Sequence, residues 1–230
     1  MSIFRDFIEL FFPRTCSICG KKLLEGEDGI CIGCQIGLPE ALAARGADNF
    51  VEKRFWGRVP VESATSLLIF KQNNKTQTTL HQIKYRGDTK LADIMGQRMG
   101  QWIIETGRFN SVDMMVPVPL HRRKERKRGY NQSLLLCQGI AKVFERPVST
   151  GNLVRLKKTD TQTRKNREQR MDNMAGVFAV KNPEELENKH ILLIDDVITT
   201  GATTEACYQA MKDIAGLRIS IASLAVSGDT

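Results

Sequence analysis

An acidic pair, Asp195 and Asp196, directly follows a hydrophobic run at residues 191–194. In open α/β sheets, ligands bind at the carboxyl ends of the strands, and this order of residues puts the two carboxylates there. The next segment leads into a helix, where backbone N–H groups and the dipole favour an anion, and its glycine lets the backbone approach a ligand closely. The pattern therefore predicts a pair of acceptors for hydroxyl groups beside a phosphate-binding loop, which consists of Thr199, Thr200, Gly201, Ala202 and Thr203.

Three simpler interpretations of the same stretch stay open. Threonine before a helix is often only an N-cap, and an acidic strand end can simply be solvated. Two aspartates after a hydrophobic run can also form the magnesium-binding strand of a P-loop NTPase. That class requires the pattern G-x-x-x-x-G-K-[ST], which this chain lacks. The combination of an acidic pair, a TTG turn and a further threonine favours the phosphate-binding interpretation.

Four cysteines near the beginning of the chain form two C-x2-C pairs: Cys16, Cys19, Cys31 and Cys34. Two such pairs can supply four thiolates to one tetrahedral ion, which predicts a structural Zn²⁺ site that folds the segment. Disulfides are the alternative, but we expect a chain without an export signal to stay in a reducing compartment. The other two cysteines, Cys137 and Cys207, lie in apolar helical patterns and are expected to be core residues.

The net charge of +8 comes from two basic segments, residues 121–128 and 155–170. Each segment carries a net charge of +5, so the remainder of the chain is slightly negative. Concentrated positive charge predicts an anionic partner at these two places. The alternative is that both segments are only solvated charged surfaces.

Predicted strands and helices alternate along the rest of the chain. The expected strands are residues 63–70, 114–121, 152–156, 176–180, 190–197 and 218–226, and the expected helices are 78–106 with a break at Gly87, 129–144 and 203–216. A basic turn is expected after residue 121. This alternation predicts an α/β fold with a parallel sheet and right-handed crossovers.

The chain divides into an N-terminal helix with the cysteine module at residues 1–40, a linker at 41–60 and the α/β domain at 61–230. We expect a short helix at the apolar N-terminus, packed on its own domain or touching a membrane surface. Asp6 and Glu9 interrupt this stretch and no cleavage site follows, so we expect no secretory signal and a cytoplasmic protein. No apolar run approaches the roughly 18 residues of a transmembrane segment.

The stretch ILLIDDVITTGATT resembles the signature of type I phosphoribosyltransferases. Together with VPVPLHRRKERKRGYNQS, HQIKYRGD, TQTRKNREQRMDN and the cysteine pairs, it is similar to the ComF/GntX family over nearly the whole chain. The resemblance implies a parallel-sheet type I phosphoribosyltransferase-like core at residues 61–230 behind a zinc-ribbon module with four cysteine ligands. It also links the chain to DNA uptake during competence or to the use of DNA as a nutrient.

The resemblance assigns roles to particular residues. Asp195 and Asp196 would contact the ribose of phosphoribosyl pyrophosphate and act as the catalytic pair, and residues 199–203 would hold its 5′-phosphate. The pyrophosphate, accompanied by Mg²⁺, would lie on the turn formed by Leu120, His121, Arg122 and Arg123. A flexible hood that closes over the substrate would contain Lys158, Gln162, Arg164, Arg167 and Arg170.

Two functions follow from these assignments. The first is a phosphoribosyl pyrophosphate-binding phosphoribosyltransferase with an unidentified acceptor, acting in DNA uptake or nucleotide salvage. The second is a non-catalytic, zinc-containing competence protein that binds single-stranded DNA or partner proteins and has a regulatory nucleotide pocket. Aromatic residues for base stacking are sparse near the basic segments, with only Tyr130 and Phe178 beside them. An amidophosphoribosyltransferase is not expected, because no catalytic cysteine stands at the N-terminus.

Overall fold

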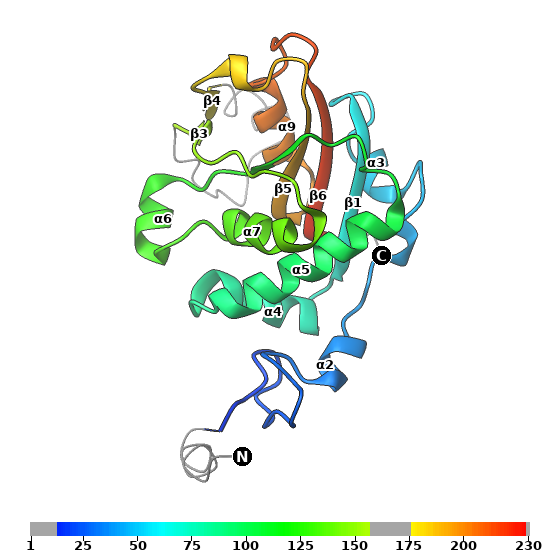
Figure 1. The fold of residues 1–230 in the computed structure, drawn as a ribbon, viewed down its shortest axis with the longest axis vertical. Helices are drawn as coiled ribbons and strands as arrows, with labels where there is room; N and C mark the ends of the chain where they lie inside the picture. Colours follow the sequence, from blue (N-terminus) through cyan, green and yellow to red (C-terminus); the bar gives the residue numbers. More distant parts are fainter. Residues whose placement is uncertain (1–12, 157–175, 229–230) are drawn as a thin grey trace.

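The computed structural model describes residues 13–156 and 176–228. Its core is a four-stranded parallel sheet with the strand order β1-β6-β5-β2 (Figure 1). A separate antiparallel pair joins β3 to β4. The strands are β1 (Val61–Phe70), β2 (Met114–Pro117), β3 (Leu153–Arg155), β4 (Phe178–Val180), β5 (His190–Ile198) and β6 (Arg218–Ser227). The parallel sheet confirms the predicted α/β class.

Helices cover both faces of the sheet. The longer ones, α4 (Lys75–Tyr85), α5 (Thr89–Thr106) and α7 (Gln132–Phe144), pack on one face, and α3 (Phe50–Lys53) and α9 (Ala202–Gln209) pack on the other. Successive strand residues point to opposite faces, so β5 gives Leu192 and Ile194 to the first hydrophobic cluster and Ile191 and Leu193 to the second. The short helices are α2 (Ile32–Ile36), η1 (Leu42–Ala44), α6 (Arg122–Arg128) and η2 (Pro183–Glu185).

Several predicted elements differ from the structure, including the strand expected at residues 114–121, which ends at Pro117. The basic turn is a helix, α6, because His121 Nδ1 accepts a hydrogen bond from Arg123 N and Gly129, with φ +88°, ends the helix. The strands β3 and β4 pair with each other instead of joining the parallel sheet. The helix expected at 203–216 ends at Gln209, after which the chain turns so that Met211 is fully buried.

The cysteine module lies at one end of the molecule, beyond α4 (Figure 1). Its Ile30, Cys34 and Leu38 belong to the same hydrophobic cluster as α5. The following segment, residues 41–60, packs on the sheet and does not span open solvent, because Ala44 and Phe55 are completely buried in the second cluster. Asn49 caps α3 and also donates from Nδ2 to Ala64 O of β1 at 2.8 Å.

A close crossing of α5 and α7 gives the first testable prediction. A Cβ on Gly139 would lie 2.5 Å from Asp93 O and 2.8 Å from Gly96 Cα, both backbone atoms that cannot move aside easily. We expect Gly139→Ala to lower the free energy of unfolding by roughly 1–3 kcal/mol, measured by urea unfolding. Gly33→Ala is the control, because a Cβ there meets no atom within 4 Å and should be nearly neutral. Equal effects of both substitutions would contradict the prediction.

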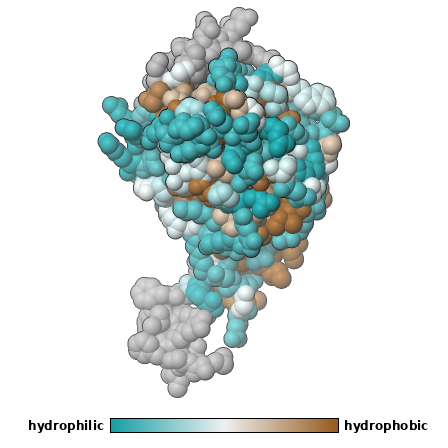
Figure 2. Space-filling view, turned by 45° about the horizontal axis from the view of Figure 1, so that its top comes forward, coloured by the Kyte–Doolittle hydropathy of each residue, from teal (hydrophilic) through white to brown (hydrophobic). Residues whose placement is uncertain are grey.

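The described residues contain no helix that combines the length and apolar character of a membrane-spanning segment. The face turned forward in Figure 2 is mostly hydrophilic, and hydrophobic side chains reach it in separate patches.

Candidate functional site

The acidic pair lies near the carboxyl end of β5. Of the two strands that flank β5, β2 is the shorter one. Residues 114–117 of β2 pair with residues 191–194 of β5, and β2 then ends at Pro117. On the other side, β6 continues to pair with β5 as far as Ile198. Asp195 and Asp196 therefore lie just past the end of β2. In sheets of this kind, ligands bind here, at the carboxyl ends of the strands.

The two carboxylates point to opposite faces of the sheet, because successive strand residues alternate. Asp196 lies on the face of α4, where Lys84 Nζ is 3.1 Å from its Oδ2. Despite this ion pair, Oδ2 is buried and accepts no hydrogen bond of good geometry from the described residues. The Asp196 carboxylate therefore retains capacity for a further hydrogen-bond donor.

Asp195 lies on the opposite face, near Arg155 of β3 and Cys207 of α9. Its Oδ1 accepts a hydrogen bond from Asp196 N at 2.8 Å. Burial, together with the charge of Asp196, raises the pKa of Asp195 to about 7, although the backbone hydrogen bond, Lys84 and Arg155 act in the other direction. The acidic pair is thus two different groups, one ion-paired carboxylate and one carboxyl that titrates near neutral pH.

The predicted phosphate-binding loop, residues 199–203, follows β5 and opens α9. Gly201 has φ +79° and is buried against Phe55, whose Cε1 would lie 2.8 Å from an added Cβ. Thr199 and Thr200 are exposed, and Thr200 Oγ1 accepts a hydrogen bond from Ala202 N at 3.4 Å. A residue other than glycine at position 201 would be strained both by its backbone angle and by Phe55.

Residues between α3 and β1 support this loop from outside. Arg54 donates to Thr199 O, and Arg58 donates to Thr200 O at 3.1 Å and forms an ion pair with Glu205 at 2.9 Å. In these contacts, guanidinium groups donate hydrogen bonds to the carbonyl oxygens of Thr199 and Thr200. The segment at residues 41–60, which was expected to be a linker, therefore helps to hold the predicted phosphate loop in place.

The turn after β2 lies beside the acidic pair. Val118 N donates to Ile194 O, the residue before Asp195, at 2.9 Å. Asn131 Nδ2 donates to Val118 O at 3.1 Å and so ties the turn to the start of α7. The residues predicted to bind pyrophosphate come next in the chain: Leu120, His121, Arg122 and Arg123. Of these, Arg122 and Arg123 are exposed at the beginning of α6.

The predicted hood residues Lys158, Gln162, Arg164, Arg167 and Arg170 lie outside the described residues. The described chain on either side of them forms the β3–β4 pair, in which Leu156 N donates to Val177 O at 2.8 Å. Arg155, at the end of β3, is close enough to Asp195 to lower its pKa.

The four predicted cysteine ligands come together in the N-terminal module, with all sulfur atoms within 4.8 Å of one another. Four sulfurs around one zinc ion lie about 3.8 Å apart, given Zn–S bonds of about 2.3 Å, and Cys19 Sγ and Cys31 Sγ are 3.7 Å apart. Although burial raises the pKa of the Cys16 thiol, backbone hydrogen bonds at Cys31, Cys19 and Ile18 lower it to about 6. The geometry fits a tetrahedral metal ion. Cys137 and Cys207 are completely buried, as predicted for core residues.

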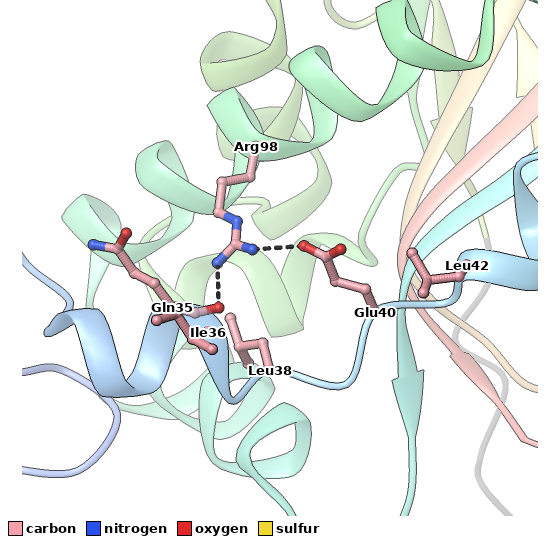
Figure 3. Close-up of a pocket in the computed structure, with 6 residues that line it drawn as sticks. All are labelled: Gln35, Ile36, Leu38, Glu40, Leu42 and Arg98. Carbon is pink, nitrogen blue, oxygen red and sulfur yellow. Dashed lines mark hydrogen bonds and ion pairs between the residues drawn. The ribbon is translucent and has the colours of Figure 1, made fainter.

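A hollow of about 620 Å³ separates α2 from α5 where the cysteine module joins the core (Figure 3). Arg98 reaches across it from α5, donating to Gln35 O at 3.3 Å and forming an ion pair with Glu40 at 2.8 Å. None of the predicted site residues lines this hollow: its lining is Gln35, Ile36, Leu38, Glu40, Leu42 and Arg98. The contacts of Arg98 serve to hold the module against the helices.

Four cations around the site were not singled out from the sequence: Arg54, Arg58, Lys84 and Arg155. Lys84 lies in the stretch HQIKYRGD, and Arg155 is the first residue of the second basic segment. Both stretches were noted in the sequence, but neither residue was assigned a role of its own. Arg54 and Arg58 lie in the expected linker, where no sequence signal related them to the loop at residues 199–203.

Known proteins with similar sequences cover most of this chain. The family described as Phosphoribosyl transferase domain matches residues 131–229. Competence protein F of Haemophilus influenzae is 30% identical over 230 residues, covering 94% of this chain and 98% of that protein. DNA utilization protein YhgH of Salmonella typhimurium is 27% identical over 219 residues, covering 88% and 92%. Competence protein ComFC of Bacillus subtilis is 29% identical over 194 residues, covering 83% and 74%. The chain, with its phosphoribosyltransferase-type α/β core and its cysteine module, belongs to the ComF family.

Proposed function

We propose that the protein binds phosphoribosyl pyrophosphate and transfers its phosphoribosyl group to an acceptor, in DNA uptake or nucleotide salvage. The observation that carries the proposal is that three parts of the chain lie at the carboxyl ends of two neighbouring strands, β2 and β5. They are the acidic pair, the loop at residues 199–203 that follows it, and the turn at residues 120–123 that follows β2, and the hydrogen bond from Val118 N to Ile194 O brings the beginning of this turn beside β5. The relatives named for competence and DNA utilization support the biological setting.

In the proposed complex, each part of the site meets one part of the ligand. Asp195 and Asp196 accept hydrogen bonds from the ribose hydroxyls, the loop at 199–203 binds the 5′-phosphate, and the turn with Arg122 and Arg123 binds the pyrophosphate. The buried Asp196 Oδ2 is ion-paired with Lys84 but accepts no hydrogen bond of good geometry from the described residues, which fits a ligand that supplies donors. Mg²⁺ bound with the ligand would neutralise the charge of the departing pyrophosphate. Positioning of the sugar is then the main contribution of this chain.

The proposal includes a structural Zn²⁺ in the cysteine module and a cytoplasmic location. Four thiolates fill a tetrahedral zinc ion completely, which leaves no open position for catalysis and makes the ion a folding element. Such a site needs reduced cysteines, which persist in a reducing compartment.

Calorimetry with phosphoribosyl pyrophosphate and Mg²⁺ tests the proposed function. We expect one binding site per chain, and release of pyrophosphate once a suitable acceptor is added. Failure of the ligand to bind at millimolar concentration would defeat the proposal.

The raised pKa of Asp195 predicts that binding depends on pH. A carboxylate accepts hydrogen bonds from hydroxyl groups better than the protonated acid does. Because burial and Asp196 raise this pKa to about 7, the affinity for phosphoribosyl pyrophosphate should increase from about pH 6 to about pH 8. The phosphates of the ligand titrate in the same range. The single variant Asp195→Asn therefore serves as the control, and an identical pH profile for both proteins would contradict the prediction.

The same pKa fixes the sign of the effect on stability. An unfolded aspartate has a pKa near the reference value of 3.8, and the folded value of Asp195 is about 7. The unfolded chain therefore loses this proton at a lower pH than the folded protein does. The contribution of Asp195 to the free energy of unfolding is largest at acidic pH and falls as the pH rises from about 4 to about 7.

The exposed basic helix α6 favours a second candidate function. It carries six basic residues and one acidic residue, and no residue of it is buried. A non-catalytic competence protein could use this surface, together with the zinc module, to bind single-stranded DNA or acidic partner proteins. DNA binding that weakens steeply with salt, without any binding of phosphoribosyl pyrophosphate, would favour this candidate over the first.

A further inference from the structure

Lys84 is the charged group that faces Asp196 across the site. Its Nζ lies 3.1 Å from Asp196 Oδ2, and the side chains are only 20% and 6% exposed. Asp195 is influenced by Lys84 and also by Arg155 of β3, which lowers its pKa. Lys84 therefore pairs directly with Asp196 and also lowers the pKa of Asp195, whereas Arg155 acts on Asp195 from a different element.

The position of Lys84 is fixed by its neighbours. Ile83 is completely buried in the hydrophobic cluster beneath α4. The carbonyl oxygen of Ile83 also accepts a hydrogen bond from the Tyr130 hydroxyl, which comes from the segment between α6 and α7. These contacts fix the backbone next to Lys84, and the ion pair of its side chain with Asp196 is largely shielded from solvent.

This arrangement disfavours a divalent cation on the acidic pair. Magnesium binds to ionised carboxylates and usually retains several waters. At Asp196 the ammonium of Lys84 already lies beside the buried oxygen. Asp195 points to the other face, so the two carboxylates do not converge on one ion from a common side. A metal ion at Asp196 would have to displace the ammonium or lie against it.

We propose that Lys84 is a built-in cation for the acidic pair, so that the ribose 5-phosphate part of the ligand binds without a divalent metal. The divalent metal is then needed only for the pyrophosphate part. Lys84 is a positioning residue here: it compensates the charge of Asp196 and leaves the carboxylate free to accept hydrogen bonds from the sugar. This inference rests on the proposed function.

The first test uses Mn²⁺ alone and needs no sugar ligand. In the zinc-loaded full-length chain, the wild-type protein should show no Mn²⁺ site at the acidic pair by electron paramagnetic resonance titration. Lys84→Met should gain one Mn²⁺ equivalent, and Lys84→Met/Asp196→Asn should lose it again. The matched control is Lys142→Met, because Lys142 also pairs with an aspartate, Asp93 at 2.6 Å, but on an exposed surface. It should gain no site.

The second test measures ribose 5-phosphate binding by calorimetry, in EDTA concentrations that chelate free Mg²⁺ and again with Mg²⁺. The wild-type protein should bind equally in both conditions. Lys84→Met should bind roughly tenfold or more weakly in EDTA, because the uncompensated Asp196 repels an anionic ligand, and should recover with Mg²⁺. The proposal would be overturned if the wild-type protein bound ribose 5-phosphate only with Mg²⁺. It would also be overturned if Lys84→Met bound ribose 5-phosphate equally well with and without Mg²⁺.

The outcomes separate this inference from the proposed function. If phosphoribosyl pyrophosphate binds but the wild-type protein requires Mg²⁺ for ribose 5-phosphate, only the role of Lys84 is wrong. If neither ligand binds under any condition, the proposed function fails and the inference fails with it. Thermal unfolding of each variant distinguishes a loss of binding from a loss of folding.

Discussion

Phosphoribosyl pyrophosphate should bind at least about 100-fold more weakly to the double variant Asp195→Asn/Asp196→Asn than to the wild-type protein. Each substitution converts a charge-assisted acceptor into a neutral amide, and hydrogen bonds to charged groups contribute about 1.5–3 kcal/mol each. Losing two of them corresponds to roughly 3 kcal/mol or more, or about 100-fold or more in affinity. Isothermal calorimetry with Mg²⁺ present measures the change directly.

The fold should survive this double substitution. Ionising the buried Asp195 costs free energy in the folded state, because its pKa is raised to about 7. Replacing Asp195 by a neutral side chain of the same shape should therefore not lower the unfolding temperature at pH 8, whereas Asp196→Asn removes the ion-pair partner of Lys84 and should lower it by a few degrees. Asp213→Asn, which changes an exposed aspartate after α9, is the matched control and should bind normally. Unchanged affinity in the double variant would refute the assignment of the acidic pair to the ribose.

Loss of the metal is expected from Cys34→Ser, the second substitution with a large effect. Cys34 is 2% exposed and belongs to the cluster of four sulfurs. A serine hydroxyl is a poor ligand for zinc in a site built from thiolates, and metal binding in small modules supplies about 10–16 kcal/mol of folding free energy. We expect the variant to lose about one equivalent of zinc, and residues 13–38 to lose protection from amide hydrogen exchange.

The parallel sheet should stay folded in Cys34→Ser, because its two hydrophobic clusters are formed mostly by the strands and by α3 to α9. Elemental analysis of the purified protein gives the zinc content. Cys137→Ala is the control: Cys137 is also completely buried but lies in α7, so its replacement should leave the zinc content unchanged. Full zinc content in Cys34→Ser would show that the four cysteines do not form the metal site.

Local patterns in the sequence predicted those parts of the protein whose residues are close in the chain. The two C-x2-C pairs bring four sulfurs together through short turns, and the acidic pair and the loop at residues 199–203 belong to one strand–loop–helix unit. The alternation of strands and helices predicted the parallel sheet, because hydrophobic periodicity reports which residues are buried. The hood and the first twelve residues lie outside the described structure, and the roles of the individual site residues stay predictions.

The sequence by itself determined the class of fold, the cysteine cluster and the order of acidic pair, loop and helix, since each depends on short-range spacing. Only the tertiary structure decided which cations surround the acidic pair. Lys84 and Arg155 come from distant parts of the chain, and the crossovers of the sheet bring them to opposite sides of β5. It also decided that Phe55 lies beneath Gly201. Such contacts depend on how layers pack, and no local pattern encodes them, because the residues meet only after the sheet has formed.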